Sequence, residues 1–423
     1  MRRLRLFLLA CLCVCAGCRR EEPPAFQGLS QAAYVWRQGW DSAAAASLAA
    51  GDLPAEVGEL IVLVGECGLG HPPRPVHPPW TQLAATGRTV SLAIRIGTGS
   101  ALNGPRGLNL QEGYALLRQG LASARAAGLP VAQVQVDFDC PVRLLSAYAE
   151  QLRQFKQLEP GLKVTITALP SWLSATGCAE LFAAVDGFTL QVHATQRPNA
   201  KEPARLVVAA DALRWIAQAA DYRRPFRVAL PTYAYVACYA RSGTLLGVRA
   251  ETRELPTGTA FTQLLPAENQ EVAAVLAALR AGRYPWVRGV DWFRLPFPGD
   301  RQNWTRAGFA QVLRGESLAA RCRVELRTQG ALTDLEVYNP TEQPLALPVV
   351  QVHWAGAGWV GADAAVGWEA SPVTGDLQRF AVDPRAGFLA PGERRERRVL
   401  GWLRLTRPAD TLHAEVVGEQ LSR

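Results

Sequence analysis

Two aspartates lie two residues apart in a short segment that has the pattern of a buried β-strand, residues 134–139. Polar and apolar side chains alternate along it, and the polar ones are Gln135, Asp137 and Asp139. Side chains at alternate positions of a strand share one face, so these three polar groups lie together. An unpaired charge buried there costs several kcal/mol, so we expect these carboxylates to have a specific role. The two alternatives are acid–base chemistry on a bound substrate and a structural ion pair, for which Arg95 is a candidate.

Three further strand-like segments carry polar side chains at alternate positions in the same way. These side chains are Ser91 and Arg95, then Thr165 and Thr167, and then Thr189, Gln191 and His193. If the segments are neighbouring parallel strands, their carboxyl ends bring Arg95, Asp139 and His193 to one edge. A lone histidine is often a hydrogen-bonded core residue, and that interpretation of His193 stays open beside a binding role.

Aromatic residues stand at or just after the ends of several of these segments. They are Trp36, Trp172, Tyr233, Tyr235 and Trp292. The apolar faces of sugars stack on such rings while polar groups fix their orientation. The combination predicts a carbohydrate site with Trp292 as its floor, although each ring taken alone fits ordinary core packing equally well. The polar residues expected to bind the substrate are Arg95, Gln135, Gln191 and His193.

The elements that would position these residues alternate between strand and helix. Eight strand-like segments cover residues 33–37, 60–66, 89–96, 134–139, 163–168, 188–193, 226–231 and 289–294. Helical patterns cover residues 110–127, 143–158, 207–220 and 267–281. Eight such units are typical of a TIM barrel, an α/β fold whose active sites lie at the carboxyl ends of the strands. An open doubly wound sheet is the alternative, but the glycines of residues 65–70 lack the spacing of its dinucleotide-binding turn.

The sequence pattern changes after Ala320: the helical periodicity ends, and short runs of alternating polar and apolar residues follow, separated by turns. This pattern predicts a small all-β sandwich. The expected division is a signal peptide (1–17), a lipidated N-terminus and tether (18–30), the barrel (31–318) and the sandwich (319–423). The five cysteines after Cys18 have no metal-ligand spacing, so we expect neither a metal nor a cofactor. Cys140 and Cys178 follow adjacent strands and are candidates for a disulfide.

The first 18 residues contain a basic start, an apolar run too short to span a bilayer, and the ending Ala16-Gly17-Cys18. These are the parts of a secretory signal. The ending is similar to the lipobox of bacterial lipoproteins, although Cys15 stands where that motif has an aliphatic residue. The resemblance implies lipidation of Cys18 and a place in the cell envelope. Arg19 favours the outer membrane, with the protein facing the periplasm or the surface; cleavage nearby to a soluble secreted protein is the alternative.

The charge of the chain indicates which partners to expect. The net charge is +8, and most of the cations are arginines scattered along the sequence. A nucleic-acid-binding protein would concentrate them with aromatic residues between them, so we expect no nucleic acid as partner. The expected partners are the membrane, through the lipid, and a glycan; the pattern gives no oligomeric state.

Residues 135–139 resemble the fourth-strand motif, Asp-x-Asp-x-Glu, of chitinase-type (family 18) glycoside hydrolases. The resemblance implies that Asp137 supports an acetamido group of the substrate and that Asp139 takes the place of the acidic Glu. Gln135 departs from the first Asp of that motif, and Trp292 resembles a tryptophan of the eighth strand. The whole mature chain more closely resembles a family of bacterial lipoproteins, domain of unknown function 3142, through residues 34–37, 135–141, 167–173 and 190–193. This second resemblance implies a hydrolase-like barrel with no assigned reaction.

Two interpretations follow from these observations. In the first, the protein is a lipid-anchored glycosidase-like enzyme, acting on an envelope or environmental glycan. Asp139 is then the general acid, favoured by burial and by its neighbour Asp137, which orients or stabilises the substrate. In the second, the protein is a non-catalytic binder of a glycan or a protein, as Gln135 and the missing Glu favour. Turnover on a panel of glycans separates the two.

Overall fold

The computed structural model describes residues 28–102, 108–201, 204–250, 255–383, 387–391 and 397–417. The expected signal peptide, Cys18 and most of the tether lie outside the described residues.

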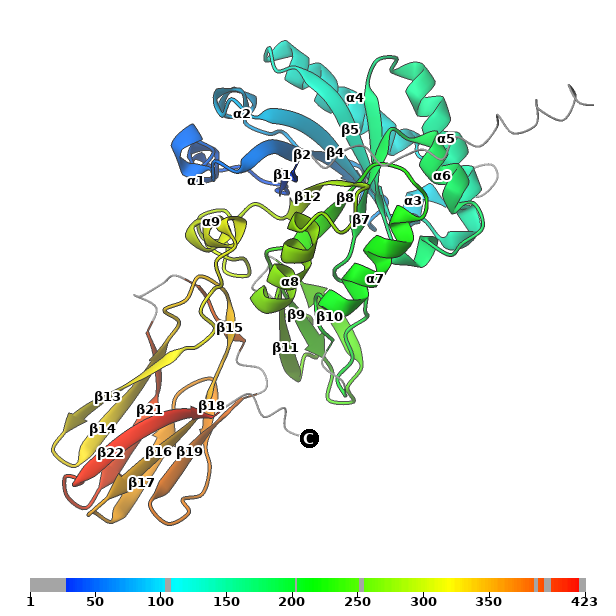
Figure 1. Ribbon diagram of the computed structural model, residues 1–423. Helices are drawn as coiled ribbons and strands as arrows, with labels where there is room; N and C mark the ends of the chain where they lie inside the picture. Colours follow the sequence, from blue (N-terminus) through cyan, green and yellow to red (C-terminus); the bar gives the residue numbers. More distant parts are fainter. Residues whose placement is uncertain are drawn as a thin grey trace, which may run out of the picture.

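Eight parallel strands close into a barrel, with helices around it (Figure 1). Their order is β1-β12-β8-β7-β6-β5-β4-β2, and β2 pairs with β1 to close the ring. The strands are β1 (Ser30–Val35), β2 (Val57–Cys67), β4 (Thr89–Ile96), β5 (Val131–Phe138), β6 (Lys163–Ala168), β7 (Gly187–Gln191), β8 (Phe226–Pro231) and β12 (Val287–Phe293). Each overlaps one of the eight predicted strands, so the TIM-like barrel is confirmed. A short strand β3 (Arg74–Pro75) pairs antiparallel with the end of β2.

The helices cover the apolar outer faces of the barrel strands. They are α1 (Ser42–Ala46), α2 (Trp80–Ala85), α3 (Thr98–Ala101), α4 (Gln111–Ala126), α5 (Leu145–Leu158), α6 (Cys178–Ala184), α7 (Ala209–Ala220), α8 (Asn269–Arg280) and α9 (Arg306–Arg314). Phe138 of β5 packs edge-on against Tyr148 of α5, at 5.3 Å between ring centroids. At Gly120 of α4, an added Cβ would come within 2.8 Å of Val64, so glycine permits this helix to pack closely on β2. The outward strand residues thus bind the helices, and the polar ones are left facing the barrel axis.

A small antiparallel sheet that the sequence analysis did not predict is inserted between β8 and α8. Its order is β10-β9-β11, with β9 (Ala234–Tyr239) in the centre, β10 (Leu245–Arg249) on one side and β11 (Phe261–Pro266) on the other. Its own small core contains Ala237, Tyr239 and Leu265.

The carboxyl-terminal part of the described chain contains two four-stranded antiparallel sheets that share one hydrophobic core. One sheet has the order β13-β14-β21-β17, and the other β18-β19-β16-β22. The strands are β13 (Arg323–Gln329), β14 (Leu332–Tyr338), β16 (Val349–Ala355), β17 (Trp359–Ala364), β18 (Trp368–Ala370), β19 (Leu377–Val382), β21 (Arg398–Leu405) and β22 (Thr411–Val417), with β15 (Leu345–Ala346) pairing with β20 (Phe388–Leu389). Leu335 and Leu403 from the first sheet meet Val350 and Phe380 from the second, as in the predicted sandwich.

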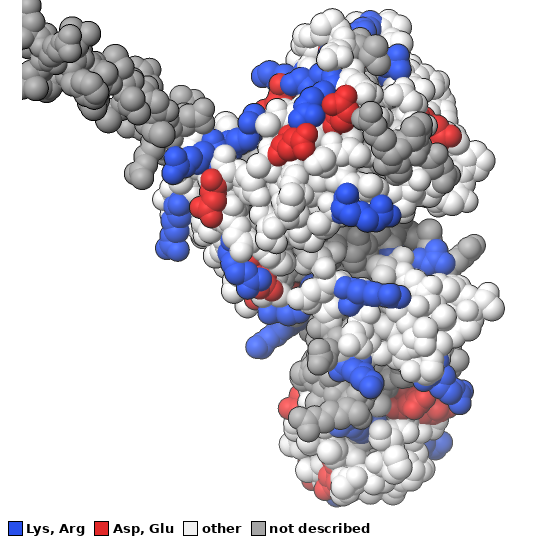
Figure 2. Space-filling model, turned by 90° about the vertical axis from the view of Figure 1, so that its right-hand side faces the viewer, with Lys and Arg blue, Asp and Glu red and all other residues white. Residues whose placement is uncertain are grey.

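The cysteines of the described residues correct one expectation. Cys67, Cys140, Cys178, Cys238 and Cys322 are all free thiols, so the expected Cys140–Cys178 disulfide is not formed. Among the helices of the described residues, none is long and apolar enough to cross a membrane. On the face shown in Figure 2, basic side chains are scattered over the molecule with acidic ones among them.

Candidate functional site

Polar side chains inside the barrel form a chain of hydrogen bonds well below the strand ends. The Tyr34 hydroxyl donates to Gln135 Oε1 at 2.6 Å, and Gln135 Nε2 donates to Thr189 Oγ1 at 3.0 Å. The Thr189 hydroxyl in turn donates to Asp291 Oδ2 at 2.6 Å, and Arg227 Nε donates to Asp291 Oδ1 at 2.5 Å. We call these five residues the interior network. Because both polar atoms of Gln135 are bonded here and its side chain is buried, this residue holds the barrel together and has no free group for a ligand.

A second polar group lies at the carboxyl ends of β4 and β5, an edge that we call the rim. Arg95 and Asp137 are paired in the register of these strands. Arg95 Nη1 donates to Asp137 Oδ2 and Arg95 Nη2 donates to Asp139 Oδ2, both at 2.7 Å. Thr167 of β6 donates to the other oxygen of Asp137 at 2.6 Å. We call Arg95, Asp137 and Asp139 the rim cluster.

Exposure differs within the rim cluster. The side chain of Asp139 is 45% exposed, whereas that of Asp137 is 10% exposed and that of Arg95 is 25% exposed. The attraction of Asp137, reinforced by Asp139, raises the pKa of Arg95 against the opposing effect of burial, so the guanidinium is a permanent cation. The ion pair with Arg95 considered in the sequence analysis therefore exists, and it leaves Asp139 within reach of solvent.

A third carboxyl group, Glu66 at the end of β2, lies in register with Arg95. Its side chain is buried, and Gln38 Nε2 donates to its Oε2 at 2.5 Å. Burial raises the pKa of Glu66, and the hydrogen bond from Gln38 opposes the shift. The sequence analysis missed this residue because regular alternation along β2 points it away from the barrel axis.

Aromatic rings form a connected group around the barrel axis near the rim. Phe293 contacts Tyr34, Trp36, His193 and Tyr233 with ring centroids 5.3–5.9 Å apart. Trp36 and Phe293 are partly exposed, and they pack against an inner apolar cluster that includes Ala93, two residues before Arg95. Tyr235 packs edge-on against Tyr233 at 4.9 Å. Thus Trp36 and Phe293 contact the same inner apolar cluster to which the strand of Arg95 contributes Ala93.

His193 lies within this aromatic group and is almost completely buried. Its Nδ1 is 3.5 Å from the Tyr233 hydroxyl, while Nε2 has no hydrogen-bond partner among the described residues. Burial lowers its pKa to about 3, so the ring is neutral at physiological pH. The Gln191 side chain donates to the backbone carbonyl of His193 at 3.2 Å.

Two tryptophans expected at the site lie elsewhere. Trp292 is fully buried on the outer face of β12, where its indole donates to Gln31 at 2.7 Å and packs on Phe309 of α9. Since Asp291 faces the axis, its neighbour Trp292 must face the helices, and the expectation that it forms the floor of the site is wrong. Phe293, which the same alternation identifies, takes that position. Trp172 is also fully buried and donates to the carbonyl of Cys140 at 3.0 Å, so it offers no surface to a ligand.

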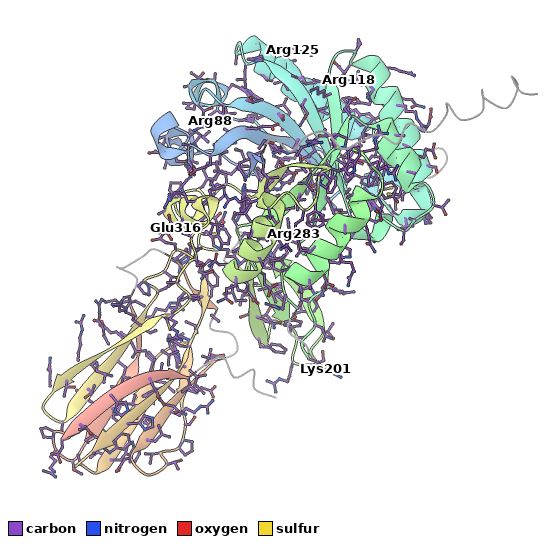
Figure 3. The ribbon with its side chains drawn as sticks, viewed as in Figure 1. Arg88, Arg118, Arg125, Lys201, Arg283 and Glu316 are labelled. Carbon is purple, nitrogen blue, oxygen red and sulfur yellow. The ribbon has the colours of Figure 1, made fainter. Side chains whose placement is uncertain are left out.

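In the rim cluster Arg95 and Asp137 lie on strands, and Asp139 directly follows β5. Arg88, Arg118 and Arg125 lie at the periphery, on helices and connections (Figure 3). Within the described residues, no three His, Cys, Asp or Glu side chains are grouped so as to hold a metal ion.

Comparison with protein families identifies the family to which the chain belongs. Residues 87–298 match the family described as a domain of unknown function, DUF3142. The chain belongs to this family. The matched part contains the rim cluster and all the strands and helices from β4 to β12 that the structure describes. Among proteins with curated descriptions, none matches this DUF3142 protein.

Solved structures similar to this DUF3142 protein include several glycan-cleaving enzymes. The spore cortex-lytic enzyme SleL of Bacillus cereus has a TM-score of 0.45 and 13% identity, over 68% of this chain and 74% of that one. A chitinase from Bacteroides thetaiotaomicron has a TM-score of 0.44 and 13% identity, over 63% and 89%. A fungal endo-β-N-acetylglucosaminidase of glycosyl hydrolase family 18 has a TM-score of 0.39 and 14% identity, over 67% and 96%.

Proposed function

We propose that this protein binds a glycan at the rim of its barrel, while anchored to the cell envelope by a lipid on Cys18. The observation that carries the proposal is the rim cluster, in which one arginine presents an exposed carboxylate at the same end of the barrel as two partly exposed aromatic rings. A carboxylate accepts hydrogen bonds from sugar hydroxyls, and a guanidinium donates to them. Trp36 and Phe293 supply the apolar surface on which a sugar face stacks.

The ion pair with Arg95 favours a binding role for Asp139 over the role of general acid. Arg95 donates to one oxygen of Asp139 at 2.7 Å, and the Asp139 side chain is 45% exposed, so it is oriented by the guanidinium and open to solvent. Its carboxylate oxygens can accept hydrogen bonds from the hydroxyls of a sugar. A charged carboxylate held by a planar guanidinium also has a fixed orientation, which suits recognition of a ligand.

The test is binding of the full lipidated chain, in detergent, to an array of oligosaccharides of glucose, galactose, mannose, xylose and N-acetylglucosamine. The parent protein is expected to bind one class of these sugars, and Asp139→Asn and Trp36→Ala are expected to weaken that binding at least tenfold. Asp186→Asn is the control, because Asp186 is an ion-paired aspartate just before the start of β7, at the opposite end of the barrel. Failure to bind any sugar, or equal binding by all four proteins, would overturn the proposal.

The anchor has its own test. Intact-mass analysis of membrane-extracted protein is expected to show a diacylglyceryl group on a chain that starts at Cys18. Changing Cys18 to Ser is expected to abolish that mass. An unmodified mature chain that starts elsewhere contradicts the anchor and leaves the glycan site to be judged separately.

A further inference from the structure

We propose that Glu66 is the proton donor of a glycoside-hydrolysing site, in which Asp139 is the partner carboxylate. The inference rests on the proposed glycan site and adds a reaction to it. It assigns the acid to Glu66, near the end of β2, and the partner role to Asp139, which follows β5. Three features of Glu66 carry the assignment: its direction, its burial and its partners.

The direction of Glu66 depends on an irregularity in β2. The register with β4 shifts between Leu63 and Gly65, so that Val64 and Gly65 both face outward. An added Cβ on Gly65 would lie 3.1 Å from Leu116 of α4, which places this residue against the helix layer. Such a β-bulge reverses the alternation that follows it and re-aims the next side chain. It brings Glu66 opposite Arg95, at the carboxyl end of a barrel strand, where active sites of this fold lie.

The partners of Glu66 differ from those of the other two carboxyl groups. Asp137 and Asp139 each accept a hydrogen bond from Arg95 at 2.7 Å. Glu66 accepts one from the neutral amide of Gln38, and its pKa is raised by burial although His71, Arg74 and Arg95 oppose the rise. Glu66 is buried, whereas the side chain of Asp139 is 45% exposed. Glu66 is therefore buried beside a neutral donor, where burial favours its protonated form, whereas Asp139 is exposed beside Arg95. Glycoside hydrolysis uses two carboxyl groups in such different environments.

The reaction balances with water as the only co-reactant. The Glu66 carboxylic acid gives its proton to the glycosidic oxygen as the bond from that oxygen to the anomeric carbon breaks. The Asp139 carboxylate takes a proton from water, whose oxygen forms the new bond to the anomeric carbon. The products are two sugar hydroxyls, and Asp139 returns its proton through solvent while Glu66 regains one. Arg95 touches both aspartates and orients Asp139, which makes it a positioning residue.

The experiment compares parent, Glu66→Gln and Glu59→Gln as full lipidated chains. Glu59 is the matched control: it is a partly buried glutamate on the same strand, at the other end of the barrel, where Ser91 donates to it at 2.5 Å. The substrates are the oligosaccharide class that binds on the array and the 2,4-dinitrophenyl glycoside of the same sugar. The second substrate has a leaving group that departs without a proton.

Glu66→Gln is expected to lower kcat on the oligosaccharide by about 10²- to 10⁴-fold and to leave KM and binding on the array unchanged. On the dinitrophenyl glycoside it is expected to retain activity within a few-fold of the parent, with the alkaline limb of the pH profile removed. Glu59→Gln is expected to behave as the parent on both substrates. This pattern separates a proton donor from a residue that merely supports the fold.

Three outcomes would overturn the inference. A parent that binds the oligosaccharide but hydrolyses neither substrate retains the glycan site and removes the reaction. Equal loss on both substrates in Glu66→Gln, with normal binding, removes the role of proton donor. A parent that binds no sugar removes both the site and the inference.

Discussion

The interior network and the rim cluster are built from the same kinds of residue on the inward side of the barrel, yet they differ in their exposure to solvent. In the interior network the hydrogen bonds from Tyr34 through Gln135 and Thr189 to Asp291 join buried side chains, and Arg227, whose side chain is 19% exposed, pairs with the fully buried Asp291. In the rim cluster, Arg95 links a nearly buried aspartate to one whose side chain is 45% exposed. The same ion-pair chemistry is closed in one region and open to solvent in the other.

This difference indicates which polar residues of the barrel stabilise the fold and which are available to bind a ligand. Closed networks of buried hydrogen bonds fix one arrangement of the strands, since each group left unpaired would cost free energy. An arrangement with an exposed carboxylate, an unpaired histidine nitrogen and a buried acid retains groups for a ligand. If this view is right, substitutions in the interior network should change stability and spare binding, and those at the rim should do the reverse.

The largest effect on stability is expected from Asp291→Asn in the interior network. Asp291 is fully buried and is paired with Arg227, whose side chain is 19% exposed. Removing its charge leaves the Arg227 guanidinium without its ion-pair partner in a poorly solvated place, which costs about 3–5 kcal/mol. Urea unfolding followed by tryptophan fluorescence measures the loss, and sugar binding by the folded variant should be unchanged. Glu180→Gln, which breaks an exposed pair with Arg153, is the control and should change the unfolding free energy little.

A pH-dependent effect of intermediate size is expected from His193. Its pKa is lowered by burial from 6.5 to about 3, so the unfolded chain binds a proton below pH 6.5 and the folded chain does not. Stability attributable to this residue is therefore lost as the pH falls from 6.5 toward 3, and between pH 7 and 5 the loss is about 2 kcal/mol. His193→Phe, which cannot titrate, should lack this loss. An equal fall of the unfolding free energy with pH in the parent and in the variant over that range would contradict the neutral, buried state of His193.

A smaller effect of opposite sign is expected from Glu66→Gln. Because burial raises the folded-state pKa of Glu66 above 4.5, the stability it contributes is complete below that value and is lost as the pH rises through the folded value. Glutamine imitates the protonated form at every pH. The variant should thus be more stable than the parent at neutral pH, with the difference vanishing below about pH 4.5. Unfolding midpoints at pH 4 and 8 measure the change, and Glu66→Gln being less stable than the parent at both would make Glu66 part of the structural framework.

The sequence predicted the barrel because its signal repeats: each of the eight strands is followed by a turn or helix, and period-2 alternation marks the inward face. The same alternation identified Arg95, Asp137 and Asp139, which the structure brings together. It failed at Glu66, because a β-bulge is a local irregularity that follows from pairing with β4 and packing on α4. The expectation for Trp292 was wrong because it did not follow the alternation, which places Phe293 and not Trp292 inside the barrel.

The inserted sheet escaped prediction for a different reason. Its central strand β9 pairs with β10 across a short turn and with β11 across a longer stretch of chain, and β9 is buried on both faces. Such a strand shows no alternation, and only the tertiary contacts distinguish it from a loop. Long-range pairing decided this part of the fold, whereas local pattern decided the barrel.

The smallest effect on stability, and the sharpest test of the comparison, is expected from Asp139→Asn. This residue is a counterpart of Asp291: both are aspartates bonded to an arginine in the same barrel, and they differ in burial. Because the Asp139 side chain is 45% exposed and Arg95 keeps its bond to Asp137, the unfolding free energy should change by no more than about 1 kcal/mol. Losing a charge-assisted hydrogen bond to a sugar hydroxyl costs about 1.5–3 kcal/mol of binding, or about 10- to 150-fold in affinity. Calorimetric titration and urea unfolding on the same preparations measure both quantities. If Asp139→Asn unfolds as readily as Asp291→Asn and binds sugar like the parent, then both carboxylates belong to one structural network, and the distinction between interior and rim fails.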